Sequence, residues 1–327
     1  MALHAKAVLG ILADNLKKRG SVLPLSKKKS NGWARGLDIP AGGETILYTG
    51  HMYQLIPTIS AMAVMMARLE DSWITRFMDL GRIANKFFNV SVFMSRADKS
   101  MQEEFDGTLR RIAILLREAG VEFGYLYEKE MYSGALIHDQ GVDESFIAHA
   151  RKVQELLAKN GVKRVITVDP HTTNMLKSVY PEMLGDFDIE VKSYFELLDE
   201  LEIEPVRKIE GDVTIHESCI YARYEDIIDQ PRRLLGRTGV DMHMPELSGL
   251  NTHCCGGPIE SLFPSKAHMV AQARIEQLLE TGSEVAAMCP ICMVNLRGAA
   301  SGKGVNIKDI SEYLAKSYCK NGGSSDG

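Results

Sequence analysis

The stretch AAMCPIC (286–292) is a short apolar run that ends at a Cys-x-x-Cys, and a helical stretch over 294–297 follows it. An earlier stretch, VITVDPHT (165–172), has the same form, with a helical stretch over 174–177 after it. The two copies are 120 residues apart when Thr172 is aligned with Cys292. Solenoid modules repeat every 20–50 residues or so. The longer offset therefore indicates duplication of a whole α/β unit.

The repeat extends in both directions from these stretches. TILYTGH (45–51) corresponds to VTIHESC (213–219), and residues 188–198 resemble residues 305–314. Short β-type runs alternate with helical runs, which predicts an α/β protein with mostly parallel strands. We expect two pseudo-symmetric Rossmann-like halves. Strands are predicted at 45–49, 121–127, 164–168, 189–192, 212–216, 239–243, 285–288 and 305–308. Helices are predicted at 55–70, 72–90, 100–119, 143–159, 173–179, 194–200, 222–235, 265–280, 291–298 and 309–318.

The first copy is longer than the second. His51 to Tyr132 spans 81 residues, whereas Cys219 to Cys254 spans 35. The excess falls at about 72–116, where apolar residues recur at helical spacing. This segment is predicted to be a helical insertion that either packs on the first half or docks a partner subunit. The predicted organisation is an N-terminal extension (1–40, with a basic, loop-like stretch at 26–36), a first half (41–204), a second half (205–320) and a disordered tail (321–327).

Five of the six cysteines fall in the second copy, as Cys219, Cys254-Cys255-Gly256-Gly257 and Cys289-Pro290-Ile291-Cys292. Cys219, the pair and Cys289 each follow a predicted strand, and ligands gather at the carboxyl ends of the strands in open α/β sheets. Five thiolates exceed the four ligands of a structural zinc ion and suit an iron–sulfur cluster. Gly256 and Gly257 permit a sharp turn and close backbone approach. A zinc site, buried core thiols and a glutaredoxin-like Cys-x-x-Cys remain as alternatives.

In the first copy, the same alignment puts other residues at the cysteine positions. They are His51, Tyr132, Ser133, Asp169 and Thr172. We infer that a duplicated cluster site survives once and has been dismantled once. With His171, these residues either form a polar pocket or a site for a harder metal ion, or are hydrogen-bonded remnants.

Composition limits the remaining classes of function. The chain has 327 residues, of which 45% are hydrophobic and 25% charged, as in ordinary globular proteins. A net charge of −5 argues against a nucleic-acid partner. No stretch reaches the roughly 18 apolar residues of a membrane helix, and the first residues lack the pattern of a signal peptide. We therefore expect no direct membrane span and a cytoplasmic location, where thiols stay reduced. Attachment to a membrane complex through another subunit stays open.

The arrangement Cys-x34-Cys-Cys-Gly…Cys-Pro-x-Cys resembles the cysteine-rich CCG domain of (Fe–S)-binding proteins, similar to the catalytic subunits of heterodisulfide reductases. The resemblance covers about 40–320, with the N-terminal motif degenerate and the C-terminal one intact. It implies a non-cubane [4Fe–4S]-type cluster held by Cys219, Cys254, Cys255, Cys289 and Cys292. It also implies an iron–sulfur electron-transfer or catalytic subunit, which exchanges electrons with a disulfide or another small acceptor within a heterodisulfide-reductase-like complex.

The chain departs from the two-motif members of this family, which cleave a disulfide between two clusters. It also has no Cys-x-x-Cys-x-x-Cys-x-x-x-Cys run. Electrons would therefore arrive from a ferredoxin-like iron–sulfur subunit or a flavin subunit. The alternative is a structural, docking or pure electron-relay subunit without substrate chemistry. Cys254, Cys255 and the adjacent His253 are the predicted catalytic residues. His253 is preferred over His216 and His243 as a donor to cluster sulfur or a proton shuttle.

Overall fold

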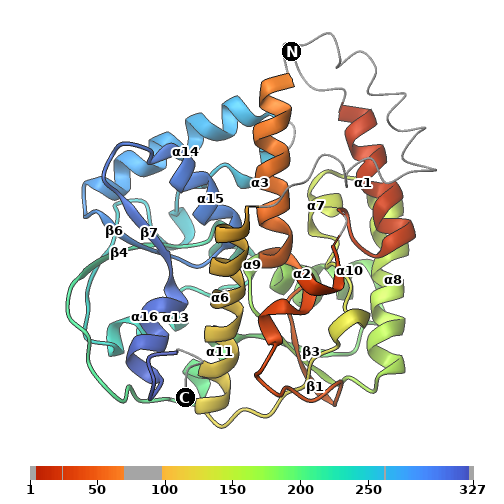
Figure 1. Ribbon diagram of the computed structural model, residues 1–327, viewed down its shortest axis with the longest axis horizontal. Helices are drawn as coiled ribbons and strands as arrows, with labels where there is room; N and C mark the ends of the chain where they lie inside the picture. Colours follow the sequence, from red (N-terminus) through yellow and green to blue (C-terminus); the bar gives the residue numbers. More distant parts are fainter. Residues whose placement is uncertain (1–4, 24, 70–97, 261–262, 324–327) are drawn as a thin grey trace.

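A computed structural model describes residues 5–23, 25–69, 98–260 and 263–323 as an α/β fold with two parallel sheets (Figure 1). The first sheet has the order β1-β2-β3, with β1 at Thr45–Tyr48, β2 at Arg164–Thr167 and β3 at Glu190–Ser193. The second sheet has the order β5-β4-β6-β7, with β4 at Asp212–His216, β5 at Asp241–His243, β6 at Glu284–Ala287 and β7 at Asn306–Asp309. Every pair of neighbouring strands is parallel. The predicted fold class, two pseudo-symmetric halves, is confirmed.

In the second sheet, β5 is the edge strand beside β4. The segment at the corresponding edge of the first sheet, beside β1, is not a regular strand. Residues 121–127 were predicted to form a strand, but they form only two isolated bridges, Ile46 with Gly124 and Ala41 with Tyr125. The reason is that the segment lies between β1 and residues 40–42. Tyr125 N–H donates to the Pro40 carbonyl, and Gly42 N–H donates to the Tyr125 carbonyl. A Cβ on Gly124 would lie 1.7 Å from the Gly42 oxygen, so only glycine fits there.

Helices connect the strands, and most begin and end within a few residues of the predicted bounds. They are α1 (Ala5–Arg19), α2 (Lys27–Asn31), α3 (Met52–Leu69), α6 (Lys99–Glu118), α7 (Ala135–Asp139), α8 (Asp143–Lys159), α9 (Pro170–Asn174), α10 (Tyr180–Leu184), α11 (Tyr194–Glu200), α12 (Cys219–Tyr224), α13 (Asp229–Arg237), α14 (Pro264–Leu279), α15 (Pro290–Ala299) and α16 (Ile310–Tyr318). Of the helices in the described ranges, none has the length and apolarity needed to cross a membrane.

Two predicted helices differ from the observed ones, and the predicted helix at 72–90 lies outside the described residues. The helix predicted at 222–235 is broken into α12 and α13, because Asp226 adopts a left-handed backbone with φ +54°. The helix predicted at 173–179 is longer, running through a π-helical turn, Met175–Val179, into α10. Pro181, which lacks an N–H, lies in the turn that follows.

The extension packs closely on the first half. α1 lies against α8, with Leu12 and Leu16 buried in a core that includes β1 and β2 residues. The stretch 26–36 was predicted to be a loop, but it contains α2 and a 3-10 turn, in which Trp33 is buried. The indole of Trp33 donates to the Tyr125 hydroxyl at 3.4 Å, and this anchor accounts for the difference. The domain boundaries at 40/41 and 204/205 remain predictions.

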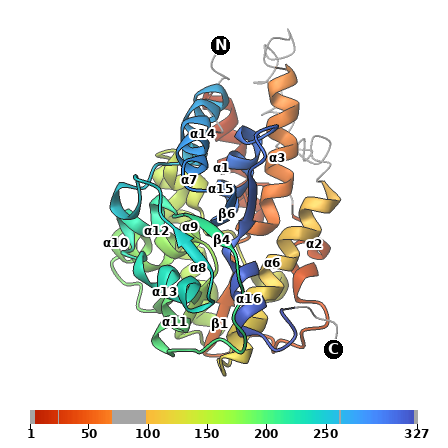
Figure 2. The same cartoon turned by 90° about the vertical axis from the view of Figure 1, so that its left-hand side faces the viewer.

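The described part of the insertion, α6, joins the two halves. Its apolar face, including Phe105, Leu109 and Ile112, is fully buried, and α6 packs on both α3 and α16. Figure 1 shows α6 between α16 of the second half and the first half, and in Figure 2 α3 and α6 lie along one side of the molecule. Glu104 of α6 forms an ion pair with Arg297 of α15 at 2.6 Å. These contacts favour the packing role over docking of a partner.

Candidate metal centre

Loops at the carboxyl ends of β4, β5 and β6 bring the five cysteines of the motif together. The sulfurs of Cys219 and Cys254 are 3.9 Å apart. The side chain of Cys254 also interacts with that of Cys255, Cys255 with Cys292, and Cys292 with Cys289. Cys255, Cys289 and Cys292 are buried, whereas Cys219 and Cys254 are half-buried. The thiols therefore form one continuous group with an enclosed side and a side nearer the solvent.

The surroundings of this group lower the pKa of some thiols and raise the pKa of others. Hydrogen bonds from Cys219 and Cys255 lower the pKa of Cys254. Burial alone would raise the pKa of Cys289, but hydrogen bonds from Cys292 and His171 lower it to about 5. The pKa values of Cys219, Cys255 and Cys292 are raised, mainly because each is hydrogen-bonded to a neighbouring cysteine. Since thiolates are the metal ligands, metal binding would release the remaining protons.

The glycines after the cysteine pair are required by packing. Gly256 has φ +82°, and a Cβ there would lie 2.5 Å from the Ala267 carbonyl oxygen of α14. Its N–H donates to the sulfur of Cys254 at 3.3 Å. A Cβ on Gly257 would lie 2.3 Å from the Ile291 side chain. The expected sharp turn and close approach are therefore present, and the approach is between the cysteine loop and the helices α14 and α15.

Three histidines near the pair have different surroundings. The ring of His253 contacts the adjacent Cys254 carbonyl at 2.9 Å through Nδ1. His243 is engaged by Asp212 at 2.6 Å. A ring nitrogen of His216 lies within 4.8 Å of the Cys255 and Cys292 sulfurs, the one such cluster of potential ligands in the described ranges. His253 remains a predicted catalytic residue, but His216 has the closer geometry to two of the cysteines.

A buried arginine forms a hydrogen bond with the ring of His216. Nε of Arg274, in α14, donates to Nδ1 of His216 at 3.1 Å. Burial, and then the positive charge of Arg274, lowers the pKa of His216 to about 3, so the ring is neutral near pH 7. The sequence contains a signal for this arginine: Arg274 is spaced at helical intervals from the apolar Ala267, Ala271 and Leu278, on the buried face of the helix.

The first half also contributes to the cysteine group. His171 and Ile291 are equivalent residues, each directly after a proline, Pro170 or Pro290. The ring of His171 interacts with the side chain of Cys289. Its Nδ1 lies 3.6 Å from Asp139. Burial opposes its charge, but Asp139 and Cys289 raise the pKa of His171 well above the ordinary value. Conversely, Ile291 packs against the hydrophobic cores of both halves. These two equivalent positions therefore both reach across the boundary between the halves.

The first-half residues aligned with the cysteines also converge. Ser133 N–H donates to the Gly50 carbonyl, and a Cβ on Gly50 would lie 2.1 Å from the Thr172 hydroxyl. Asp169 accepts from the Thr172 N–H at 2.9 Å. The group lacks three potential ligand atoms as close together as those around His216. Several of its buried atoms make no hydrogen bond: Nδ1 of His51, Ser133 Oγ, Asp169 Oδ2 and Thr172 Oγ1. Nε2 of His51 lies 3.5 Å from a carboxylate oxygen of Glu130. This first-half site is therefore polar and unlike a three-ligand metal site.

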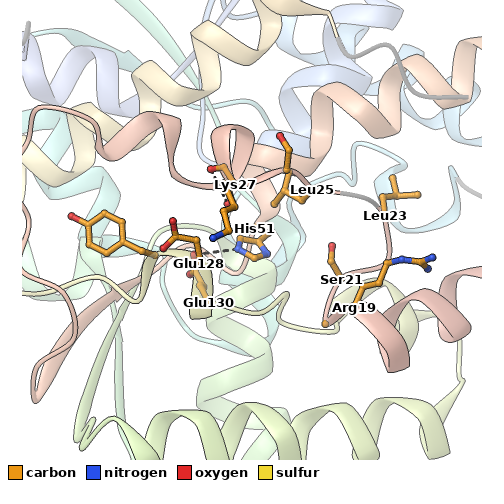
Figure 3. A pocket seen from close by; sticks show the side chains of 12 residues that line it. Arg19, Ser21, Leu23, Leu25, Lys27, His51, Glu128 and Glu130 are labelled. Atoms are coloured by element: carbon orange, nitrogen blue, oxygen red, sulfur yellow. Dashed lines mark hydrogen bonds and ion pairs between the residues drawn. The ribbon is translucent and has the colours of Figure 1, made fainter. Parts of the chain in front are cut away.

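His51 borders a cavity of about 410 Å³ (Figure 3). Arg19 and Lys27 line the same cavity, with Glu128 and Glu130. Burial lowers the pKa of His51 to about 3 and raises the pKa of Glu130 to about 7. Glu130 is saturated by the Thr49 and Tyr125 hydroxyls and by two backbone N–H groups. Its carboxylate therefore holds the end of β1 in place.

The donor set of the second half fits an iron–sulfur cluster better than zinc. Five cysteines in mutual contact exceed tetrahedral zinc coordination, and thiolates are the ligands of iron–sulfur clusters. Hydrogen-bond donors at the site, including the Gly256 N–H and His171, suit the negative charge of such a group. The fold and the site thus define an α/β protein with a thiol-rich centre at the carboxyl ends of parallel strands.

Residues 213–297 match the family model CCG, described as a cysteine-rich domain. The chain is 32% identical over 229 residues to the "Probable iron-sulfur-binding oxidoreductase FadF" of Bacillus subtilis, covering 65% of this chain and 32% of that protein. It is 27% identical over 234 residues to the "EtfAB:quinone oxidoreductase" of Syntrophomonas wolfei, covering 65% and 32%. With a subunit of the dihydromethanophenazine:CoB--CoM heterodisulfide reductase of Methanosarcina mazei, it is 28% identical over 218 residues, covering 62% and 53%. The similarity to CCG-domain and heterodisulfide reductase proteins is confirmed. The matched region is between about a third and about half of each relative's length.

Proposed function

We propose that this chain is an iron–sulfur electron-transfer or catalytic subunit of a heterodisulfide-reductase-like complex. Its ligands to one non-cubane [4Fe–4S]-type cluster would be Cys219, Cys254, Cys255, Cys289 and Cys292. The observation that carries the proposal is the meeting of these cysteines, from three separate loops, in one group. When bound, such a cluster supplies single-electron chemistry. The CCG match and the iron–sulfur relatives support the same assignment.

The buried and the half-buried cysteines of the group would have different roles. Cys255, Cys289 and Cys292 hold the enclosed side and exclude water from it. Cys219 and Cys254 are half-buried, so a small disulfide or another acceptor would approach from their side. His253, adjacent to Cys254, would orient that acceptor or hold a proton for a thiolate product. Cys254, Cys255 and His253 are thus the proposed catalytic residues.

The second candidate is a pure electron-relay or structural subunit. It is favoured by the filling of the first-half side, where His171 contacts Cys289 and Thr173 contacts the Tyr221 hydroxyl at 3.4 Å. Six cysteines cannot supply a second set of five, so this chain alone cannot place a disulfide between two such clusters. In both candidates the partners are a ferredoxin-like iron–sulfur subunit or a flavin subunit. Both candidates need reduced thiols, which favours a cytoplasmic location.

The test is anaerobic purification followed by iron, sulfide and zinc assays and EPR spectroscopy. We expect about four irons per chain and a cluster signal. Fewer than about two irons, with zinc in their place, would reject the proposal. The variant His253→Gln separates the two candidates without removing a ligand: a catalytic site loses disulfide turnover while the cluster still assembles, whereas a relay shows no such turnover in the wild type. His268→Gln, an exposed histidine of α14, is the matched control.

A further inference from the structure

His216 is the last residue of β4, and Tyr48 is its counterpart at the end of β1. The hydroxyl of Tyr48 donates to the Met131 carbonyl at 2.7 Å. His216 is equally buried, at 1% exposure, but its Nε2 has no hydrogen-bond partner among the described residues. The half with the cysteines therefore has a free ring nitrogen where the other half has a satisfied hydroxyl. An unpaired buried polar atom destabilises the folded protein.

Arg274 determines which nitrogen of His216 carries the proton. Its Nε donates to Nδ1 at 3.1 Å, while its Nη1 donates to the Leu247 carbonyl and to Gln277, each at 2.9 Å. A guanidinium is always protonated and cannot accept a hydrogen bond, so Nδ1 must be the acceptor. In a neutral imidazole the single proton is then on Nε2. The arginine is fully buried, and its contacts with His216, Leu247 and Gln277 hold its side chain in place.

Position alone leaves two roles open to His216, because one of its ring nitrogens lies within 4.8 Å of the sulfurs of Cys255 and Cys292. A nitrogen with a free lone pair could replace a cysteine on iron, as histidine does in Rieske centres. A nitrogen that carries a proton can only donate to sulfur. With Nδ1 occupied by Arg274, the nitrogen that remains is the protonated one.

We infer that Arg274 holds His216 as a hydrogen-bond donor to the sulfurs of Cys255 and Cys292 and thereby excludes it from ligating iron. The inference rests on the proposed iron–sulfur function, and it makes His216 and Arg274 positioning residues. A donor to thiolate sulfur stabilises the more negatively charged, reduced state. The pair therefore raises the reduction potential of the centre.

The experiment compares His216→Phe, which keeps a ring but removes the donor, with His216→Gln, whose amide nitrogen can donate from nearly the place of Nε2. His268→Gln, an exposed histidine of α14, is the matched control. In redox titrations we expect His216→Phe to lower the ratio of reduced to oxidised centre about tenfold at the wild-type midpoint. That ratio corresponds to about 59 mV for one electron. His216→Gln should recover most of this shift, and His268→Gln should show none.

Pulsed EPR of the wild-type protein provides a second readout that needs no variant. A weak histidine nitrogen coupling is expected for a donor, whereas a strong coupling of directly bound nitrogen would overturn the inference. An unchanged potential in His216→Phe would also overturn it. If His216→Phe fails to assemble, the wild-type spectrum decides. Iron-free wild-type protein would instead reject the proposed function and the inference with it, and the iron assay separates that outcome from the others.

Discussion

The carboxyl ends of the two sheets have similar backbones but different chemistry. Gly134 and Gly256 lie at equivalent positions, with φ +87° and +82°, and each begins a short helical turn. Each also packs against a helix, α8 in the first half and α14 in the second. The residues before them are Tyr132-Ser133 in one half and Cys254-Cys255 in the other. The turn is thus dictated by helix packing and persists without the cysteines.

The two halves also connect this loop to the first strand in different ways. In the first half, the Glu130 carboxylate accepts from the Thr49 hydroxyl at 2.8 Å and from backbone N–H groups of the same turn. In the second half, the equivalent tie is a bond from the Thr252 hydroxyl to the Glu217 carbonyl at 3.2 Å. The Glu130 carboxylate therefore ties the loop to β1 in the first half. In the second half the buried Glu217 carboxylate instead pairs with Arg232 at 2.6 Å, and a metal centre would add cross-links there. This difference predicts unequal responses to substitution.

The largest effect is expected from removing a sulfur and its first-half counterpart in parallel. Cys292→Ser should lose most of the bound iron, because a hydroxyl is a poor substitute for a thiolate ligand. Thr172→Ser, at the equivalent position, should leave the iron content unchanged. Iron and sulfide assays on anaerobically purified proteins measure both. Equal iron losses in the two variants would contradict the assignment of the metal to the second half.

Substitution of Gly256 and Gly134, both in the left-handed backbone conformation, tests whether the equivalent turns contribute equally to the free energy of unfolding. Gly256→Ala should lower the free energy of unfolding by about 2–4 kcal/mol, since a left-handed alanine is strained and its Cβ meets the Ala267 backbone. Gly134→Ala should cost less, about 1–2 kcal/mol, because its Cβ would lie 3.0 Å from the Phe146 ring, a milder clash than the 2.5 Å approach to backbone at Gly256. Urea unfolding measures both.

Gly236→Ala is the control for these substitutions. Gly236 lies in α13 with open space around it, so alanine should stabilise the helix by about 0.5–1 kcal/mol. A Gly256→Ala protein as stable as the wild type would show that the turn is less constrained than its packing indicates.

The pH dependence of stability should identify His51, the residue in the place of Cys219. Between pH 6.5 and about 3, the unfolded chain protonates this histidine but the folded chain does not, so stability falls as the pH falls. His51→Gln removes this contribution. The loss of unfolding free energy between pH 7 and pH 5 should then be about 2 kcal/mol smaller than in the wild type. Denaturant titrations at the two pH values measure it, with the exposed His268→Gln as control. Parallel profiles for His51→Gln and the wild type would show that His51 titrates normally.

The smallest effect concerns the helix that joins the halves. Glu104→Gln in α6 removes the ion pair with Arg297, whose side chains are both 33% exposed. The expected cost is about 0.5–1 kcal/mol, and it should shrink at high salt. Glu103→Gln is a control without this pair. A cost that does not depend on salt would indicate that shape rather than charge holds α6 to α15.

Much of the fold could be predicted because parallel, buried strands are continuous apolar runs. β4, α8 and α11 begin and end at the predicted residues. Local signals failed where contacts distant in the chain decide the outcome. The strand predicted at 121–127 is replaced by bridges because residues 40–42 occupy its far side. The break between α12 and α13 depends on one left-handed residue, Asp226, which apolar periodicity does not reveal.

For the site, too, local sequence patterns predicted some features, whereas contacts distant in the chain decided the others. The convergence of cysteines at the strand ends could be predicted, because spacing and topology place them at one edge. The contribution of His171 could not, because Asp139 and Cys289 reach it from two other segments. His216 ends the strand predicted at 212–216, but its pairing with Arg274 depends on a contact between α14 and β4 that the sequence does not reveal. The ligand set itself remains a prediction that metal analysis tests.

His171 and Ile291 cross the boundary between the halves in opposite directions. An engineer who cut out residues 205–320 as a minimal redox module would keep every sulfur of the motif. The excised module would lack the imidazole that contacts Cys289, and it would expose to water the face that the first half now covers. The first half thus covers the cysteine group of the second half. Transfer of the centre to another scaffold would require an equivalent covering surface.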